Sequence, residues 1–160
     1  MYLSEPDGTT ILRRGDRMKR VYVNEKWCLG CHLCEYYCAF ADTNETDMAR
    51  ALKDIKINPR IRIEEKDEVC FAVSCRHCRE PLCVKGCITG ALTISDGVIT
   101  IDTDRCIGCY TCILCCPYGA ISYSEGKTVR KCELCIRTSD KTPACVKGCP
   151  NGAIVFEERG

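Results

Sequence analysis

The sequence has no long hydrophobic run and few large core residues. None of its 160 residues belongs to an apolar stretch near the roughly 18 residues of a membrane span, and residues 1–20 lack the apolar segment of an export signal. Tryptophan occurs once, phenylalanine three times and tyrosine seven times. We therefore expect a cytoplasmic protein without a membrane anchor, whose small core needs another source of stability.

An excess of one sign of charge and the common catalytic motifs are also missing. The 23 Lys and Arg residues balance 22 Asp and Glu residues, so the basic footprint of nucleic-acid binding is absent. No Gly-rich phosphate loop, nucleotide fingerprint or serine or cysteine triad is recognisable. The sequence therefore predicts a protein that binds no nucleic acid and is not itself an enzyme.

Cysteine, in contrast, is abundant, with 18 residues. Without an export signal, a disulfide scaffold is not expected, because cysteine-dense cytosolic proteins usually bind metal. Sixteen of the cysteines form four groups of four. Group one is Cys28, Cys31, Cys34 and Cys38; group two is Cys75, Cys78, Cys83 and Cys87; group three is Cys106, Cys109, Cys112 and Cys116; group four is Cys132, Cys135, Cys145 and Cys149.

The spacing within the groups is that of a bacterial ferredoxin. Groups one and three follow the x2-x2-x3 pattern, and Pro117 completes the motif in group three. Three cysteines at x2 intervals wrap one [4Fe–4S] cluster, whereas the fourth lies where the chain turns into a helix and ligates a different cluster. Such runs come in complementary pairs, so four groups predict four [4Fe–4S] clusters.

Three other chemistries use similar cysteine pairs. Zinc ribbons contain C-x2-C pairs but do not need the third and fourth cysteines. The segment Cys28–His32 matches a haem-attachment motif, which leaves Cys34 and Cys38 unexplained. A thioredoxin-like site needs one C-x-x-C motif, whereas this sequence contains many of them close together. Iron–sulfur binding is favoured, and a zinc-stapled binding module is the remote alternative.

Internal repeats indicate duplication. The segment 27–31 is echoed at 105–109, and 81–87 is echoed at 143–149. The fold class is predicted to be α+β and ferredoxin-like: two pseudo-symmetric two-cluster units with short hairpins and helices around the clusters. Strands are expected at 21–23, 61–63, 69–73, 92–94, 98–101, 121–123, 128–129 and 154–156, with a type I′ turn at Asp96-Gly97 and a short helix from an Asn44 cap through Leu52.

The lengths between the groups predict how the units divide. Groups two and three are separated only by residues 88–105, which suits one two-cluster unit, and groups one and four then pair across the whole chain. The predicted organisation is a basic N-terminal extension, a first unit and a second unit: 1–20, 21–74 with 117–160, and 75–116.

With these motifs in place, residues 19–157 resemble the four-cluster iron–sulfur subunits of anaerobic oxidoreductases, including formate dehydrogenase, dimethyl sulfoxide reductase and hydrogenase-linked enzymes. The segments Cys28-Leu-Gly-Cys-His-Leu-Cys-Glu, Cys75-Arg-His-Cys and Val84-Lys-Gly-Cys-Ile-Thr-Gly-Ala are similar to the electron-transfer subunit of anaerobic carbon monoxide dehydrogenase, with the subunit of tungsten aldehyde oxidoreductases as a near rival.

The resemblance implies an electron wire between a catalytic subunit and a second redox partner. Carbon monoxide dehydrogenase is the first choice of catalytic subunit, and a tungsten aldehyde oxidoreductase or formate dehydrogenase follows. The second partner would be a flavin oxidoreductase, a hydrogenase or another copy of the chain. A free-standing polyferredoxin is the alternative.

The resemblance also implies the ligand sets. They are Cys28, Cys31 and Cys34 with Cys149; Cys38 with Cys132, Cys135 and Cys145; Cys75, Cys78 and Cys83 with Cys116; and Cys87 with Cys106, Cys109 and Cys112. The sequence departs from the family at Ala39, where a proline is usual, so the turn after Cys38 is less constrained.

Several residues near the groups remain to be assigned. The x3 step and Pro117 favour Cys116 over Cys115 as a ligand. Cys70 has no partner spacing and is expected to be a small buried hydrophobic residue. His32 and His77 are expected on the surface or in packing roles. The basic segment 13–20 is either a docking element or a mobile tail.

Overall fold

Short antiparallel hairpins carry the fold. The computed structural model describes residues 18–43, 45–138 and 142–159, so the predicted basic extension up to residue 17 lies outside them. Eight strands form four two-stranded sheets within these residues: β1 (Arg20–Val23) with β8 (Ile154–Glu157), β2 (Arg62–Lys66) with β3 (Val69–Val73), β4 (Leu92–Ser95) with β5 (Val98–Ile101), and β6 (Ile121–Tyr123) with β7 (Val129–Lys131).

Three of the sheets are local hairpins, and the fourth joins the two ends of the described chain. In the β1–β8 sheet, Val21 pairs with Phe156 and Val23 with Ile154. The Asp96-Gly97 turn between β4 and β5 has φ values of 48° and 78°, which confirms the predicted type I′ turn because that turn needs two positive φ angles. The strand predicted at 128–129 begins at Val129 and continues to Lys131.

The helices are short, and four of them begin at a cysteine group. These four are α1 (Leu33–Phe40), α3 (Leu82–Lys85), α4 (Thr111–Cys115) and α5 (Ala144–Lys147), while η1 (Glu25–Trp27) and α2 (Met48–Ala51) lie elsewhere. The predicted cap Asn44 lies outside the described residues. The N-cap of α2 is Asp47, whose side chain accepts a hydrogen bond from the Arg50 N–H at 3.0 Å.

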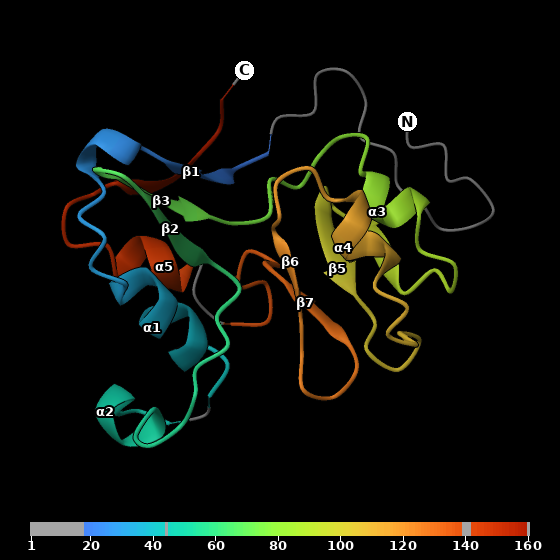
Figure 1. Cartoon of the computed structure of the whole chain (residues 1–160), viewed down its shortest axis with the longest axis horizontal. Helices are drawn as coiled ribbons and strands as arrows, with labels where there is room; N and C mark the ends of the chain where they lie inside the picture. Colours follow the sequence, from blue (N-terminus) through green and yellow to red (C-terminus); the bar gives the residue numbers. More distant parts are fainter. Residues whose placement is uncertain (1–17, 44, 139–141, 160) are drawn as a thin grey trace.

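The elements gather into two lobes, as Figure 1 shows. The first lobe holds β1, β8, β2, β3, α1, α2 and α5, and the second holds β4 to β7 with α3 and α4. Helix α1 packs on α5 in the first lobe, and α3 packs on α4 in the second. Among the described residues the longest helix, α1, has eight residues, and none has the length and apolarity to cross a bilayer.

The described residues form two small cores in which thiols replace part of the usual hydrocarbon, one mainly in each lobe; the first also takes in Val98 of β5. The first core contains eleven buried residues, five of them cysteines, and the second contains seven, two of them cysteines. Ile121 and Val129 of β6 and β7 belong to the second core. The predicted assignment of residues 117–160 to the first unit stays a prediction. The expected α+β content of short hairpins and helices is confirmed.

Candidate metal centres

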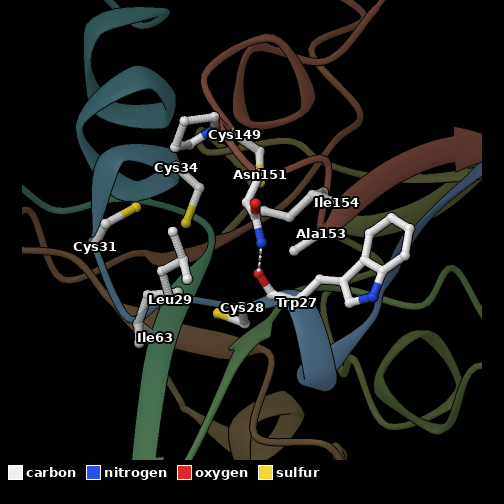
Figure 2. A pocket seen from close by; sticks show the side chains of 11 residues that line it. Trp27, Cys28, Leu29, Cys31, Cys34, Ile63, Cys149, Asn151, Ala153 and Ile154 are labelled. Atoms are coloured by element: carbon white, nitrogen blue, oxygen red, sulfur yellow. Dashed lines mark hydrogen bonds between the residues drawn. The ribbon is translucent and has the colours of Figure 1, made fainter.

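Four thiols from the two ends of the chain line one cavity in the first lobe (Figure 2). Three of them come from group one and the fourth, Cys149, from group four. We call this space cavity one; its lining residues are Trp27, Cys28, Leu29, Cys31, Cys34, Ile63, Cys149, Pro150, Asn151, Ala153 and Ile154. Apart from these thiols and Asn151, the residues that line it are apolar.

Hydrogen bonds hold the two sides of cavity one together. The Asn151 side-chain amide donates to the Trp27 carbonyl at 2.7 Å, which is the dashed line in Figure 2. The Asn24 N–H donates to the Ala153 carbonyl at 2.8 Å. These bonds, together with the β1–β8 sheet, place the Cys149 turn beside the group one loop although more than 100 residues separate them.

A second cavity with the same construction lies in the second lobe. Three of its thiols come from group three and the fourth, Cys87, from group two. We call it cavity two; its lining residues are Cys87, Thr89, Ala91, Leu92, Ile101, Cys106, Ile107, Cys109, Tyr110, Cys112 and Val129. The two cavities are equal in size.

The remaining eight grouped cysteines lie deeper and form two sets. We call Cys38, Cys132, Cys135 and Cys145 the first inner set. Burial raises the pKa of Cys145 well above its ordinary value, and the neighbouring thiols of Cys132, Cys38 and Cys135 raise it further. Burial likewise raises the pKa of Cys132 to about 12. This mutual influence means that groups one and four meet inside the first lobe.

The second inner set consists of Cys75, Cys78, Cys83 and Cys116. Burial raises the pKa of Cys83 to about 11, and the thiols of Cys75 and Cys116 add to the rise. The same two thiols raise the pKa of Cys78, after burial. Cys116, rather than Cys115, is thus the group three thiol near the first three cysteines of group two.

The four loops share one backbone design. The residue before the second cysteine has a positive φ in every group: Gly30 at 63°, His77 at 44°, Gly108 at 70° and Leu134 at 55°. Histidine and leucine rarely adopt this conformation, and it costs of order 1 kcal/mol or more. Its recurrence shows that the four loops make the same tight turn at the same position of each cysteine group.

The third cysteine occupies the same helical position in each group. Cys34, Cys83, Cys112 and Cys145 are each the second residue of a helix, namely α1, α3, α4 and α5. The helix therefore begins at the third cysteine, and not at the fourth as the spacing suggested. The x3 step then carries the fourth cysteine about one turn along, so that it points into the next site.

Among the described residues, several backbone N–H groups point at thiol sulfurs. The N–H groups of His77, Leu134 and Arg60 lie 3.5, 3.4 and 3.3 Å from the sulfurs of Cys75, Cys132 and Cys38. Hydrogen bonds to cysteine sulfur favour the thiolate form and help to set cluster potentials.

A buried histidine tests whether an iron–sulfur cluster fits. The Ile99 N–H donates to His77 Nδ1 at 3.0 Å, so the ring proton must lie on Nε2. His77 is fully buried, and its Nε2 has no hydrogen-bond partner among the described residues. Because burial and then Lys131 and Arg20 lower its pKa to about 2, the ring is a neutral donor. A cluster sulfur held by Cys75 and Cys78 would be a fitting acceptor.

All 18 cysteines are free thiols, and no disulfide joins them. Within the described residues no three His, Cys, Asp or Glu side chains converge tightly enough for a single metal ion. The ligands of a cubane bind four separate irons and therefore stand further apart. The thiols surround cavities, which is the arrangement that a cluster larger than a single metal ion requires.

The two cysteines outside the groups, Cys70 and Cys115, each pack against a glycine. Cys70 is partly exposed on β3, where its sulfur would lie 3.0 Å from a Cβ added to Gly30; the expectation of a buried hydrophobic residue was therefore wrong, because the hairpin leaves that side of β3 open. The Cys115 sulfur would lie 2.9 Å from a Cβ on Gly86, and Cys115 is not among the residues that line cavity two.

The two histidines also differ from each other. His32 Nδ1 lies 2.8 Å from Glu35 and its Nε2 lies 3.4 Å from Glu65, and the bond to Glu35 raises its pKa. It therefore has a surface role, whereas His77 has a buried one, as the sequence allowed. Two further buried polar residues, Lys131 and Glu133, were missed. Their only sequence signal is that they flank Cys132 at the end of a strand.

Comparison with known proteins adds the family context. The model of the 4Fe-4S dicluster domain family matches residues 67–159. An iron–sulfur protein of Rhodospirillum rubrum is 34% identical over 150 residues, which cover 84% of this chain and 79% of that protein. The electron transport protein HydN of Escherichia coli is 32% identical over 148 residues, covering 82% and 83% of the two chains.

Other relatives differ in length. The B subunit of the anaerobic dimethyl sulfoxide reductase of Escherichia coli is 34% identical over 145 residues, covering 84% of this chain and 71% of that subunit. Two longer Escherichia coli relatives, UacF and AegA, are matched over 20% and 21% of their length. Among solved structures, one subunit of the BamBC active site complex of benzoyl coenzyme A reductase, as isolated, shares 20% identity with a TM-score of 0.48 over 90% of this chain and 79% of that subunit.

Proposed function

The chain belongs to the 4Fe-4S dicluster domain family, and on this premise we propose that it conducts electrons along four [4Fe–4S] clusters between a catalytic oxidoreductase subunit and a second redox partner. It is an iron–sulfur electron-transport subunit and not the catalytic chain. When bound, the clusters supply one-electron redox chemistry at cysteine-ligated iron. The sixteen grouped cysteines are the number that four such clusters require.

The proposed ligand sets are those of the two cavities and the two inner sets. Cys28, Cys31 and Cys34 act with Cys149, and Cys106, Cys109 and Cys112 act with Cys87. The shared lining of each cavity supports these two sets. The mutual effects of the inner thiols on their pKa values support the other two.

The contacts between sets support a linear order. The thiol of Cys34, beside cavity one, raises the pKa of Cys145 in the first inner set. Cys75 of the second inner set raises the pKa of Cys132 of the first. Cys83 of the second inner set shares a core with Cys112 beside cavity two. The order is therefore cavity one, first inner set, second inner set and cavity two.

Both ends of this order lie close to exposed apolar side chains. Trp27 and Leu29 beside cavity one are 55% and 66% exposed, and Ile107 beside cavity two is 64% exposed. Large apolar side chains exposed beside a redox site suit a protein interface. We propose that the cavity one end meets the catalytic subunit and the cavity two end meets a flavin oxidoreductase, a hydrogenase or another copy of the chain.

For the catalytic subunit, carbon monoxide dehydrogenase is the first choice. The support is the similarity of the group one segment and of Cys75–Cys78 to the subunit that serves that enzyme. A tungsten aldehyde oxidoreductase or a formate dehydrogenase comes next. The relationship to a subunit of dimethyl sulfoxide reductase supports the broader class of anaerobic oxidoreductases.

Reconstitution tests the function directly. Donor enzyme and acceptor are combined with the holoprotein, without it, and with Cys87→Ala, and the acceptor's reduction is followed. We expect the protein to accelerate transfer and Cys87→Ala to block it, while donor turnover with an artificial dye continues. Cys115→Ala is the matched control and should transfer normally. Equal rates with and without the protein would refute the proposal.

A further inference from the structure

The open edge of strand β5 is covered by three buried side chains rather than by another strand. The Ile99 N–H donates to His77 Nδ1, and the Ile99 carbonyl accepts from Lys131 Nζ. The Ile101 N–H donates to Glu133 Oε1 at 2.8 Å. His77, Lys131 and Glu133 are 0%, 1% and 3% exposed. A bare strand edge in the interior would leave polar groups unpaired, and these three side chains provide the missing hydrogen-bond partners.

Lys131 stands at the boundary between the two inner thiol sets. Its Nζ also donates to the Cys132 carbonyl at 2.6 Å, within the first inner set. Its positive charge lowers the pKa of Cys132 and also that of Cys83, which belongs to the second inner set. One buried cation therefore acts on thiols of two different groups, and Cys75 and Cys132 are themselves close enough to interact.

We propose that Lys131 sets the reduction potentials of the two inner clusters, which its buried positive charge raises together. This proposal rests on the proposed function and on the inner ligand sets. A positive charge nearby favours the reduced, more negative state of a cluster, and in the interior it is neither solvated nor screened by salt. Lys131 thus keeps the reduction potentials of the two inner clusters, in the middle of the electron path, higher than the cysteine ligands alone would make them.

An exposed lysine elsewhere shows why burial matters. Lys85 lies two residues from both Cys83 and Cys87, but its side chain is 60% exposed and its Nζ lies 3.3 Å from Glu80. Water and the partner carboxylate weaken the field of such a group. Lys85 is therefore a matched control for the loss of one lysine charge close to ligands.

Glu133 supplies a test of the opposite sign. Its side chain is 3% exposed, its Oε1 binds the Ile101 N–H, and its Oε2 lies 3.5 Å from the exposed Arg137. Glutamine can still accept the Ile101 hydrogen bond while it removes the charge. Replacement of Glu133 should thus raise the potential of the first inner cluster, whereas replacement of Lys131 should lower it. Damage to packing would not produce opposite shifts.

The experiment is a redox titration of the anaerobic holoprotein followed by electron paramagnetic resonance. Cys132→Ala and Cys78→Ala identify the signals of the two inner clusters. In Lys131→Met we expect the ratio of oxidised to reduced inner clusters at a fixed potential to rise about tenfold, which is 59 mV for a one-electron couple. Lys131→Arg should stay close to the wild type, Glu133→Gln should shift in the opposite direction, and Lys85→Met should not shift.

The possible outcomes distinguish the proposed role of Lys131 from the proposed electron-transfer function of the protein. Unchanged inner potentials in a fully loaded Lys131→Met protein, or an equal shift in Lys131→Arg, would overturn it. If Lys131→Met fails to load four clusters, Lys131→Gln, whose amide can still donate a hydrogen bond but carries no charge, decides: a downward shift supports the proposal, and none overturns it. If reconstituted transfer does not depend on the protein while Lys131→Met still shifts the potentials, the wire fails and the role of Lys131 stands.

Discussion

Cavity one and cavity two repeat the same loop but differ in their polar groups. With the groups aligned, Leu33 in the first lobe occupies the position of Thr111 in the second, and Asn151 occupies that of Thr89. Hydrogen bonds from the Thr111 side chain and backbone lower the pKa of Cys109. Burial raises the pKa of Cys87, but bonds from the Leu92 backbone and the Thr89 hydroxyl outweigh it and lower the pKa.

Cavity one has no hydroxyl at either of these positions. The Asn151 side-chain amide donates to the Trp27 carbonyl, and the Leu33 side chain has no group that could donate a hydrogen bond to a thiol. Burial raises the pKa of Cys34 to about 12, whereas for the equivalent Cys112 it raises the pKa to about 11. The comparison teaches that duplicated cysteine groups acquire different thiol environments through the residues between the cysteines.

The helix pairs of the two lobes show a second contrast. Gly148, the C-cap of α5, faces Tyr37 of α1, whereas the equivalent Gly86, the C-cap of α3, faces Cys115 of α4. Tyr37 and Cys115 both directly precede the fourth cysteine of their groups. Cys115 thus fills the packing position that a tyrosine fills in the first lobe, which explains why a cysteine stands beside a predicted ligand.

Removal of iron is the change with the largest expected effect on both lobes. The loaded protein should contain about 16 iron atoms and 16 acid-labile sulfides, and stripping them should unfold the chain. Five of the eleven residues in the first core are cysteines, against two of seven in the second. The first lobe should therefore unfold first when a chelator removes the iron.

The single tryptophan makes this order measurable. Trp27 lies beside cavity one, so its fluorescence follows the first lobe, while circular dichroism follows both. Iron and sulfide analysis runs alongside. Native-like circular dichroism after complete iron removal, or about four zinc ions without sulfide, would contradict the prediction.

Protons should be released when the clusters load. A thiol of an unfolded chain has a pKa of about 8.5, and burial raises the pKa of Cys132 to about 12 and that of Cys83 to about 11. These thiols are therefore protonated at neutral pH in the metal-free chain, whether it is unfolded or folded. Ligation needs the thiolate. Loading should consequently strengthen as the pH rises from 6 to 8, and a pH-stat should record base uptake. Loading that is independent of pH would contradict the idea that protonated thiols are the metal-free state.

Single ligand substitutions should break one site and spare the others. Cys38→Ala should perturb the same cluster as Cys132→Ala and leave that of Cys28 largely intact, because Cys38 lies with the first inner set. Each variant should lose up to about four of 16 iron atoms. Cys116→Ala should lose a cluster and Cys115→Ala should not. Spectra in which the Cys38 and Cys28 variants damage one common cluster would exclude the proposed sets.

The two equivalent glycines should respond unequally to alanine. A Cβ on Gly148 would overlap the Tyr37 ring, whereas one on Gly86 would lie 2.9 Å from the Cys115 sulfur. We expect Gly148→Ala to cost roughly 2–3 kcal/mol and Gly86→Ala roughly 1 kcal/mol, because the small thiol can shift and the ring cannot. Chemical denaturation of the holoproteins measures the free energy of unfolding of each variant. Equal losses of stability in the two variants would show that the helix pairs of the two lobes do not differ in packing.

The smallest expected effect is an exchange of hydroxyls between the cavities. Thr111→Val should lower the potential of the cavity two cluster, since a hydrogen bond to sulfur favours the reduced state. Leu33→Thr should raise the potential of the cavity one cluster. Each change should amount to about 1 kcal/mol or less. Redox titration measures both, and shifts of the same sign would show that the hydroxyls do not distinguish the sites.

The sequence alone determined the features that depend on neighbouring residues. Cysteine spacing identified the four groups, and Asp96-Gly97 identified a hairpin that the φ angles confirm. Period-two segments located β3 at its observed bounds, whereas β2 begins one residue later than predicted and ends three residues later. Such signals are local, because loop wrapping and turn chemistry involve residues only a few positions apart.

Only the tertiary structure decided which distant residues meet. The family resemblance already implied that Cys149 joins group one, but the structure alone places Cys70 against Gly30 and buries Lys131 and Glu133 on the edge of β5. No spacing rule predicts a buried lysine, because a charged residue is normally solvated unless distant partners satisfy it. Those partners, the Ile99 and Cys132 carbonyls, exist as a pair only after the end of β7 has packed against β5.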